Sequence, residues 1–176
     1  MKNYVYIATS LDGYIAGKND SLDWLPSPDS KLNLELGFEA FMDKVDVLVM
    51  GKNTFEMVRS FGIPWPYTKP VFIVSTSITE IPQGYEDKIK LVRGNPKDIL
   101  EEVHSFGYKN LYIDGGVTVQ NFLKEDLIDE LIITTIPVLL GDGKSLFSKL
   151  ENRLDFECVS ASVDKGIVQT HYKRKK

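Results

Sequence analysis

The chain has 176 residues, of which 43% are hydrophobic and 26% are charged, and its formal net charge is −4. These values are typical of a water-soluble globular domain with a full core, and they exclude disordered and fibrous chains. The small negative charge gives no general attraction to nucleic acid or to anionic membranes, so we expect neither as a partner.

The residues suited to redox and metal chemistry are few. The chain contains one cysteine, Cys158, and two histidines, His104 and His171. A lone cysteine cannot form an internal disulfide, which fits the reducing cytoplasm. Two histidines far apart in the sequence support neither a histidine-rich metal site nor a Ser-His-Asp triad. We therefore expect a cytoplasmic protein without a bound metal.

Short apolar runs rich in β-forming residues alternate along the chain with segments of helical spacing. The runs predict strands over Tyr4–Ala8, Val45–Met50, Val71–Val74, Ile89–Val92, Leu111–Ile113 and Leu131–Pro137. The helical segments run from Lys31 or Leu32 to Lys44, over Lys52–Ser60, from Pro96 after an Asn95 cap to about Phe106, and over Val117–Lys124. The glycine-containing segments Thr9–Gly17 and Gly141–Gly143 are expected to be loops.

The C-terminal part predicts a β-hairpin, in which Asp164-Lys165-Gly166 joins strands over Phe156–Val163 and Ile167–Tyr172. Strands alternating with helices indicate an α/β domain with a mostly parallel sheet, to which the hairpin adds antiparallel strands at one edge. Because neither a linker nor an internal repeat is present, we expect residues 1–176 to form one domain.

The stretch Leu111–Leu123 combines a short strand, the turn Asp114-Gly115-Gly116 and a helix. Free backbone N–H groups and a positive macrodipole lie at the start of such a helix. Two glycines allow a phosphate to approach the main chain without obstruction by a Cβ atom. The stretch thus predicts a pyrophosphate cradle, with an ordinary βα turn as the alternative. Neither GxGxxG nor GxxxxGK[ST] is present.

Two further strands end in turns of similar chemistry, Met50–Thr54 and Val74–Ser77. The carboxyl ends of parallel strands share one rim, where α/β proteins bind ligands. Three such turns rich in N–H and hydroxyl donors indicate a long polyanionic ligand. Lys52 supplies a point charge suited to phosphate, and Arg93 could add a fork of donors. Taken one at a time, these residues are also ordinary helix starts and turn formers.

The segments Tyr4–Gly17, Val47–Glu56 and Leu111–Leu123 together resemble the dihydrofolate reductase-like superfamily. Within it, Ser10–Ala16 and the run Pro137–Gly143 followed by Phe147 are typical of one group. That group includes the reductase domain at the C-terminal end of the bifunctional riboflavin-biosynthesis deaminase/reductase. The resemblance spans nearly the whole chain. It implies a dihydrofolate reductase-like three-layer fold and an NADPH-dependent reductase.

The reaction implied by the resemblance is hydride transfer to a C=N or C=O bond of a small heterocyclic or sugar-linked substrate. The riboflavin-pathway reductase acts on 5-amino-6-(5-phosphoribosylamino)uracil. A true dihydrofolate reductase is the enzymatic alternative. The alternative from another class is a non-catalytic NADP-binding domain.

The resemblance also implies which residues meet NADPH. The pyrophosphate and 2′-phosphate are expected on Gly51, Lys52, Asn53 and Thr54, with the adenosine part flanked by Val74, Ser75, Thr76, Ser77 and Arg93. The pyrophosphate cradle is expected to be formed by Ile113, Gly115, Gly116, Val117 and Thr118, with Val119 and Asn121 nearby. The main chain of Ala8 and Ile15 is expected to hold the nicotinamide carboxamide, under a loop formed by Ala16–Trp24.

The substrate side leaves an alternative open. Folate reductases carry an acid on their first helix, and spacing from Gly51 points to Glu35, whereas spacing from Trp24 points to Asp29. Trp24 and Thr134 are expected to contact the substrate. The stretch Gly37–Lys44 contains no arginine or histidine, which disfavours a ribose-phosphate substrate.

Two further features follow from the resemblance. Asp114 stands where many folate reductases have another glycine, which places a carboxylate near the phosphates. Members with the Gly141–Phe147 loop are commonly dimeric, and Leu146 and Phe147 are apolar residues of an expected exposed loop. We therefore expect a homodimer with this loop or the terminal hairpin near the interface.

Overall fold

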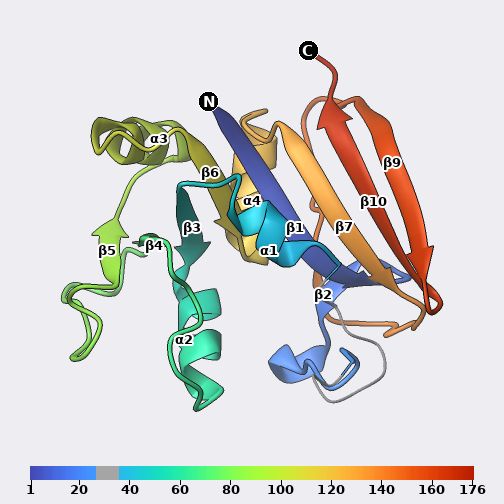
Figure 1. The fold of residues 1–176 in the computed structure, drawn as a ribbon, viewed down its shortest axis with the longest axis horizontal. Helices are drawn as coiled ribbons and strands as arrows, with labels where there is room; N and C mark the ends of the chain where they lie inside the picture. The colour runs from blue at the N-terminus through green and yellow to red at the C-terminus, as the bar shows by residue number, and fades with distance from the viewer. Residues whose placement is uncertain (27–35) are drawn as a thin grey trace.

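The structure is a computed structural model that describes residues 1–26 and 36–176. Its centre is a sheet of eight strands in the order β5-β4-β3-β6-β1-β7-β10-β9 (Figure 1). These strands are β1 (Lys2–Ser10), β3 (Val47–Gly51), β4 (Val71–Val74), β5 (Ile89–Val92), β6 (Asn110–Asp114), β7 (Glu130–Ile136), β9 (Phe156–Asp164) and β10 (Ile167–Arg174).

The first six strands in this order, β5, β4, β3, β6, β1 and β7, are parallel to one another. Strand β10 is antiparallel to β7, and β9 is antiparallel to β10. The predicted mostly parallel sheet with a C-terminal hairpin at one edge is therefore confirmed. Lys165 and Gly166, between the two hairpin strands, have φ values of 49° and 85°. Positive φ at both central residues is what a type I′ turn requires, and such turns match the twist of paired strands.

Helices lie on both faces of the sheet, which gives three layers (Figure 1). Side chains of a strand alternate between faces, so each buried parallel strand contributes to two cores. In β3, for example, Leu48 and Met50 pack with Phe41 and Phe55 from the helices on one face. Val47 and Val49 pack with residues of two other helices on the opposite face, Ile99, Val103, Val119, Phe122 and Leu123.

Four α-helices lie in the described residues: α1 (Phe38–Met42), α2 (Lys52–Ser60), α3 (Pro96–Ser105) and α4 (Gly116–Lys124). The predicted cap of α3 is confirmed, because the Asn95 side chain accepts hydrogen bonds from the N–H groups of Lys97 and Asp98 at 2.9 and 3.1 Å. The expectation of one continuous helix that ends at Lys44 is wrong at Gly37. This residue has a left-handed φ of 85°, and α1 begins directly after it. Its expected start at Lys31 or Leu32 lies outside the described residues.

The segment expected as a loop, Thr9–Gly17, begins with the last two residues of β1 and contains a second strand, β2 (Tyr14–Ala16). A 3₁₀ turn, η1 (Lys18–Asp20), follows it. β2 pairs antiparallel with β8 (Lys144–Ser145), which is also in an expected loop region. Gly143 allows this approach, since a Cβ atom there would clash with the Ala16 carbonyl oxygen.

The expectation that Leu146 lies in an exposed loop is wrong. Its side chain is fully buried and its N–H donates to the Gly13 carbonyl at 3.0 Å. Phe147, the next residue, is 48% exposed as expected.

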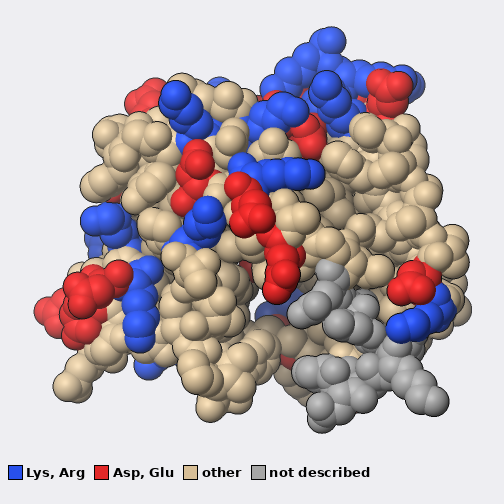
Figure 2. Space-filling view, viewed as in Figure 1, with Lys and Arg blue, Asp and Glu red and all other residues tan. Residues whose placement is uncertain are grey.

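Basic side chains gather near the C terminus on the face shown in Figure 2. Two of them are held in ion pairs, Arg174 with Asp126 at 2.7 Å and Lys176 with Asp129 at 2.9 Å. These ion pairs tie the end of the chain to the turn before β7. No helix among the described residues has the length and apolar character needed to cross a membrane.

Candidate functional site

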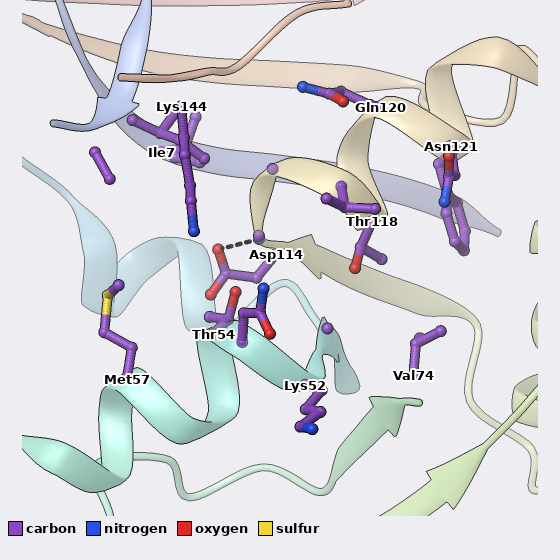
Figure 3. Close-up of a pocket in the computed structure, with 18 of the residues that line it drawn as sticks. Ile7, Lys52, Thr54, Met57, Val74, Asp114, Thr118, Gln120, Asn121 and Lys144 are labelled. Atoms are coloured by element: carbon purple, nitrogen blue, oxygen red, sulfur yellow. Dashed lines mark hydrogen bonds between the residues drawn. The ribbon is translucent and has the colours of Figure 1, made fainter. Parts of the chain in front are cut away.

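The carboxyl ends of four parallel strands, β1, β3, β4 and β6, border one cavity of about 640 Å³. Helices α2 and α4 both begin at this cavity, so their free N–H groups and positive dipole ends lie beside it (Figure 3). The short strands β2 and β8 supply further lining residues, including Ile15 and Lys144. The arrangement is that of a crevice at the carboxyl edge of an α/β sheet.

The turn between β6 and α4 depends on glycine at Gly115. Its φ of +87° is left-handed, and a Cβ atom there would clash with the Thr54 hydroxyl oxygen. Gly116 has no positive φ, but a Cβ atom on it would lie 2.7 Å from the Ile15 Cδ1 atom. Thr54 lies on α2, so the bare backbone of Gly115 lets the first turns of α2 and α4 approach closely.

The start of α2 is also tightly placed. A Cβ atom on Gly51 would lie 2.9 Å from the Thr118 hydroxyl oxygen, which belongs to the first turn of α4. Lys52 is half-buried at the rim, where its Nζ donates to Ser77 Oγ at 3.1 Å. Its Nζ also lies 4.0 Å from the Glu56 carboxylate, one turn further along α2. A lysine at a helix start with such loose contacts is suited to a phosphate group.

Most of the cofactor residues predicted from the sequence line this cavity. They are Ala8, Ile15, Gly51, Lys52, Asn53, Thr54, Val74, Gly115, Gly116, Val117, Thr118 and Asn121. Val117 is 69% exposed, although its spacing indicated an apolar helix face. The cavity therefore brings together two of the three predicted turns, those at Gly51 and Gly115, and the first residue of the third, Val74.

Other predicted cofactor residues do not line the cavity. Ile113 and Val119 are fully buried in the core, and the Ser75 hydroxyl accepts backbone N–H groups of its own turn, from Ser77 at 3.1 Å and Ile78 at 2.9 Å. Arg93 donates to the Ile78 carbonyl at 3.2 Å, which braces the same turn. The remaining two, Thr76 and Ser77, are exposed beside it.

The predicted substrate residues are not brought to the cavity wall. Thr134 is buried in β7, where its hydroxyl oxygen accepts from Gln169 Nε2 at 3.1 Å. Trp24 is half-buried and does not line the cavity, although its neighbours Leu22 and Leu25 do. Asp29 and Glu35, the two candidate acids, lie outside the described residues.

One carboxylate points into the middle of the cavity. Asp114 ends β6, and its Oδ1 accepts the Gly115 N–H at 2.8 Å, while Lys144 points toward it from the opposite wall (Figure 3). Burial raises the pKa of Asp114 to about 6. Hydrogen bonds from the Gly115 N–H and the Tyr112 hydroxyl lower this pKa, but the effect of burial is larger. Asp114 therefore gains and loses its proton near pH 6, well above the range of an ordinary aspartate.

Several lining residues were not foreseen. Met57 follows Thr54 by three residues on α2, so helical spacing alone could have placed it on the same face. Lys144 forms an ion pair with Asp20, and no local pattern indicates a contact between residues so far apart in the sequence. Leu25 lies in an irregular segment without periodicity, whereas Leu22 belongs to the loop Ala16–Trp24 that was expected beside the cofactor.

Comparison with known families bears on this geometry. Residues 4–169 match the family described as the RibD C-terminal domain. The chain belongs to this family. The match covers every strand from β1 to β9 and both helices that begin at the cavity. The resemblance stated from the sequence is thereby confirmed.

Solved structures with the RibD C-terminal domain fold extend the comparison. A protein from Shewanella sp. PV-4, assigned provisionally to riboflavin biosynthesis, is 54% identical over the whole of both chains, with a TM-score of 0.93. The deaminase/5-amino-6-(5-phosphoribosylamino)uracil reductase of Thermotoga maritima is 13% identical, with a TM-score of 0.76 over 99% of this chain and 56% of that enzyme.

Dihydrofolate reductase from Enterococcus faecalis, in a complex with NADP(H), has a TM-score of 0.65. It is 16% identical over 99% of this chain and 97% of that chain, which shows a shared fold. The predicted dihydrofolate reductase-like fold class is therefore confirmed.

Replacing Asp114 should stabilise the protein at neutral pH. Its folded pKa of about 6 exceeds the ordinary value of 3.8, so folding favours the protonated carboxyl and stability falls as pH rises between these values. Asp114→Asn should therefore raise the free energy of unfolding by roughly 3 kcal/mol at pH 7 and leave it unchanged near pH 3.5. Urea denaturation across this pH range measures both.

The matched control is Glu101→Gln, which neutralises an exposed carboxylate on α3 and should shift stability little at any pH. Equal stability of Asp114→Asn and the unmodified protein at pH 7 would show that Asp114 is well solvated.

Proposed function

We propose that this protein is an NADPH-dependent reductase of the riboflavin-pathway reductase type, which transfers hydride to a C=N or C=O bond of a small heterocyclic or sugar-linked substrate. The observation that carries the proposal is the meeting of two helix N-termini around the Gly115 backbone in one cavity of a RibD C-terminal domain. The dihydrofolate reductase that shares this fold is in a complex with NADP(H), which supports the choice of cofactor.

The residues present fit a dinucleotide phosphate. The close approach at Gly115 leaves a cradle that a Cβ atom would fill, and the N–H groups at the starts of α2 and α4 are donors for pyrophosphate oxygens. Lys52 adds the cation suited to a 2′-phosphate, and the Ala8 and Ile15 main chain would orient the carboxamide. When bound, the nicotinamide supplies the hydride and the protein positions it.

A proton must reach the substrate as hydride is delivered. The Asp114 carboxyl lines the cavity, and burial raises its pKa to about 6. We assign it the role of holding this proton, since an acid works best when its pKa is near the working pH. The sequence-based candidates Asp29 and Glu35 remain alternatives for the same role.

Two other functions remain in competition. A true dihydrofolate reductase would oxidise NADPH with dihydrofolate, and a non-catalytic NADP-binding domain would bind NADPH without turnover. Absorbance loss at the NADPH band, with dihydrofolate and with 5-amino-6-(5-phosphoribosylamino)uracil as separate substrates, distinguishes the three functions.

NADPH should bind at least tenfold more tightly than NADH, a difference of about 1.4 kcal/mol, because Lys52 stands where a 2′-phosphate can reach it. Fluorescence titration with each cofactor measures the two dissociation constants. Lys52→Ala should remove most of the difference by weakening NADPH alone. The control Lys124→Ala, at the far end of α4, should leave both constants unchanged. Equal constants for NADPH and NADH in the unmodified protein would contradict the assignment.

The same titration can be applied to a variant of the glycine turn. Gly116→Val should abolish binding of both cofactors, because its side chain fills the cradle next to Ile15. Circular dichroism should remain unchanged, since φ at Gly116 is not left-handed. Wild-type affinity in this variant would place the pyrophosphate elsewhere.

The rate of hydride transfer should fall as the pH rises above about 6, because the Asp114 carboxyl loses its proton there. Asp114→Asn should lower the rate at pH 5.5 by roughly 100-fold or more and remove this pH dependence. Single-turnover kinetics at saturating NADPH make the measurement. Asp29→Asn and Glu35→Gln serve as comparisons, and loss of the pH dependence in either one would transfer the role to that residue.

We also propose a homodimer, built on the edge strand β9. Residues 157–164 of this strand are exposed, and Val159 and Val163 are 55% and 72% exposed. A long edge strand with free N–H and C=O groups readily pairs with a second strand. Light scattering should give twice the chain mass of 19.9 kDa. Val163→Lys should shift the protein toward monomer, whereas Ile63→Lys, at another exposed apolar site, should not.

A further inference from the structure

The adjacent strands β1 and β6 separate as they approach the cavity. Their parallel pairing ends where Tyr4 lies opposite Tyr112. Each strand then continues along its other neighbour, β1 along β7 as far as Ser10 and β6 along β3 as far as Asp114. A gap therefore opens between the two strands, and Ala8 of β1 and Asp114 of β6 line the cavity on its two sides.

Two side chains replace a backbone hydrogen bond that is lost at this gap. Extending the register by two residues would place Tyr6 opposite Asp114, so that the Gly115 N–H would donate to the Tyr6 carbonyl oxygen. Instead, the Gly115 N–H donates to Asp114 Oδ1 at 2.8 Å. The Tyr6 carbonyl oxygen accepts the Tyr112 hydroxyl at 2.8 Å. Asp114 and Tyr112 thus satisfy the two backbone groups that the separation of the strands leaves unpaired.

The Tyr112 hydroxyl has a second partner, which is Asp114. The two residues are two positions apart on β6, so their side chains lie on the same face of the sheet. Tyr112 is only 6% exposed. Burial raises the pKa of Asp114, and a hydrogen bond from the Tyr112 hydroxyl opposes this effect. Burial and the charge of Asp114 raise the pKa of the Tyr112 hydroxyl well above its ordinary value, so the hydroxyl keeps its proton.

A phenolic hydroxyl has one proton to donate, whereas this one lies between two acceptors. It can donate fully either to the Tyr6 carbonyl or to the Asp114 carboxylate. When Asp114 is protonated, its carboxyl needs no donor, and the Tyr112 hydroxyl stays on the Tyr6 carbonyl. When Asp114 is ionised, the carboxylate is the better acceptor, because hydrogen bonds to charged groups are the stronger ones.

Three other titratable groups of the described chain face this pair, namely Tyr6, Tyr67 and Lys144. Burial raises the pKa of both tyrosines, so each of them stays neutral over the working pH range. Lys144 points toward Asp114 from the opposite wall (Figure 3) and is paired with Asp20. Its charge is constant near pH 6, so the group that changes state there is Asp114.

We propose that Tyr112 is a positioning residue of this site, whose hydroxyl caps the Tyr6 carbonyl while Asp114 is protonated and turns to the Asp114 carboxylate when that proton leaves. This inference rests on the proposed reductase function, in which Asp114 supplies the proton. Ala8, two residues beyond Tyr6 on β1, is expected to hold the nicotinamide carboxamide. Proton delivery by Asp114 is thereby linked to the backbone beside the cofactor.

Carbon-13 NMR of the cofactor-free protein tests this switch without any turnover. The Asp114 carboxyl signal is assigned by its absence from Asp114→Asn, and its chemical shift against pH gives the midpoint of its titration. The Tyr6 carbonyl carbon is followed in the same samples. Its shift should change with the same midpoint, because the carbonyl loses its hydrogen bond when Asp114 ionises. A Tyr6 carbonyl shift that stays constant through this midpoint would overturn the proposal.

Tyr112→Phe removes the hydroxyl and keeps the ring. The Asp114 midpoint should move upward by about one pH unit, because the ionised form loses a hydrogen bond. The Tyr6 carbonyl shift should lose most of its pH dependence. An unmoved Asp114 midpoint would show that Tyr112 only fills space. If circular dichroism shows that this variant does not fold, the titration of the unmodified protein decides the question.

Tyr108→Phe is the matched control, because Tyr108 is a half-buried tyrosine that packs on the opposite face of the sheet. It should leave the Asp114 midpoint and the Tyr6 carbonyl titration unchanged. The same changes in this variant as in Tyr112→Phe would count against a specific role for Tyr112.

The pH profile of hydride transfer connects the switch to the reaction. In Tyr112→Phe, the fall in rate should begin about one pH unit higher than in the unmodified protein. A profile that stays in place while the Asp114 midpoint moves would remove Tyr112 from the reaction. Absence of NADPH oxidation would overturn the reductase, whereas the NMR titration still decides the switch. Turnover without the switch would overturn this inference alone.

Discussion

The close approach of the Gly115 backbone to the Thr54 side chain is the contact on which the site depends. No side chain fits between them, so the first turns of α2 and α4 lie against each other instead of being held apart. Their N-termini then lie at one cavity, and two partial positive charges face the same space. A longer separation would leave two weak anion sites, whereas this spacing suits the two linked phosphates of a dinucleotide.

Asp114 is a buried carboxylate beside the helix starts that we propose bind phosphate, so its charge and its burial both matter. Its carboxylate would repel a nearby phosphate when ionised, and burial raises its pKa to about 6, so the neutral form predominates only below that pH. A neutral carboxyl can donate a hydrogen bond to a ring atom and causes no repulsion. Burial is the largest cause of this raised pKa, and the Gly115 N–H and the Tyr112 hydroxyl act against it. The residue therefore costs stability at neutral pH, where its carboxylate is buried in the ionised form.

Local sequence patterns were sufficient for the eight strands of the main sheet, for three of the four described helices and for the hairpin. Periodicity and turn chemistry depend on a few neighbouring residues. Gly115-Gly116 therefore predicts its own turn, and Asn95 predicts the helix start that it caps. Patterns failed where partners are distant: the pairing of β2 with β8, the burial of Leu146 and the ion pair of Lys144 with Asp20. The expected helix before Lys44 failed at Gly37, because spacing alone does not show where a glycine adopts a left-handed φ.

The pairing of β2 with β8 also sets the order in which this protein can become functional. Tyr14 and Ser145 pair across a long separation in the sequence, and β1 pairs with the similarly distant β6 and β7. Contacts of such long sequence separation slow folding, because the intervening loop must close before they form. A newly made chain can form its local helices before the cavity has walls. The cavity is thus a product of the long-range pairings, and a ligand that needs all of its walls would report their completion.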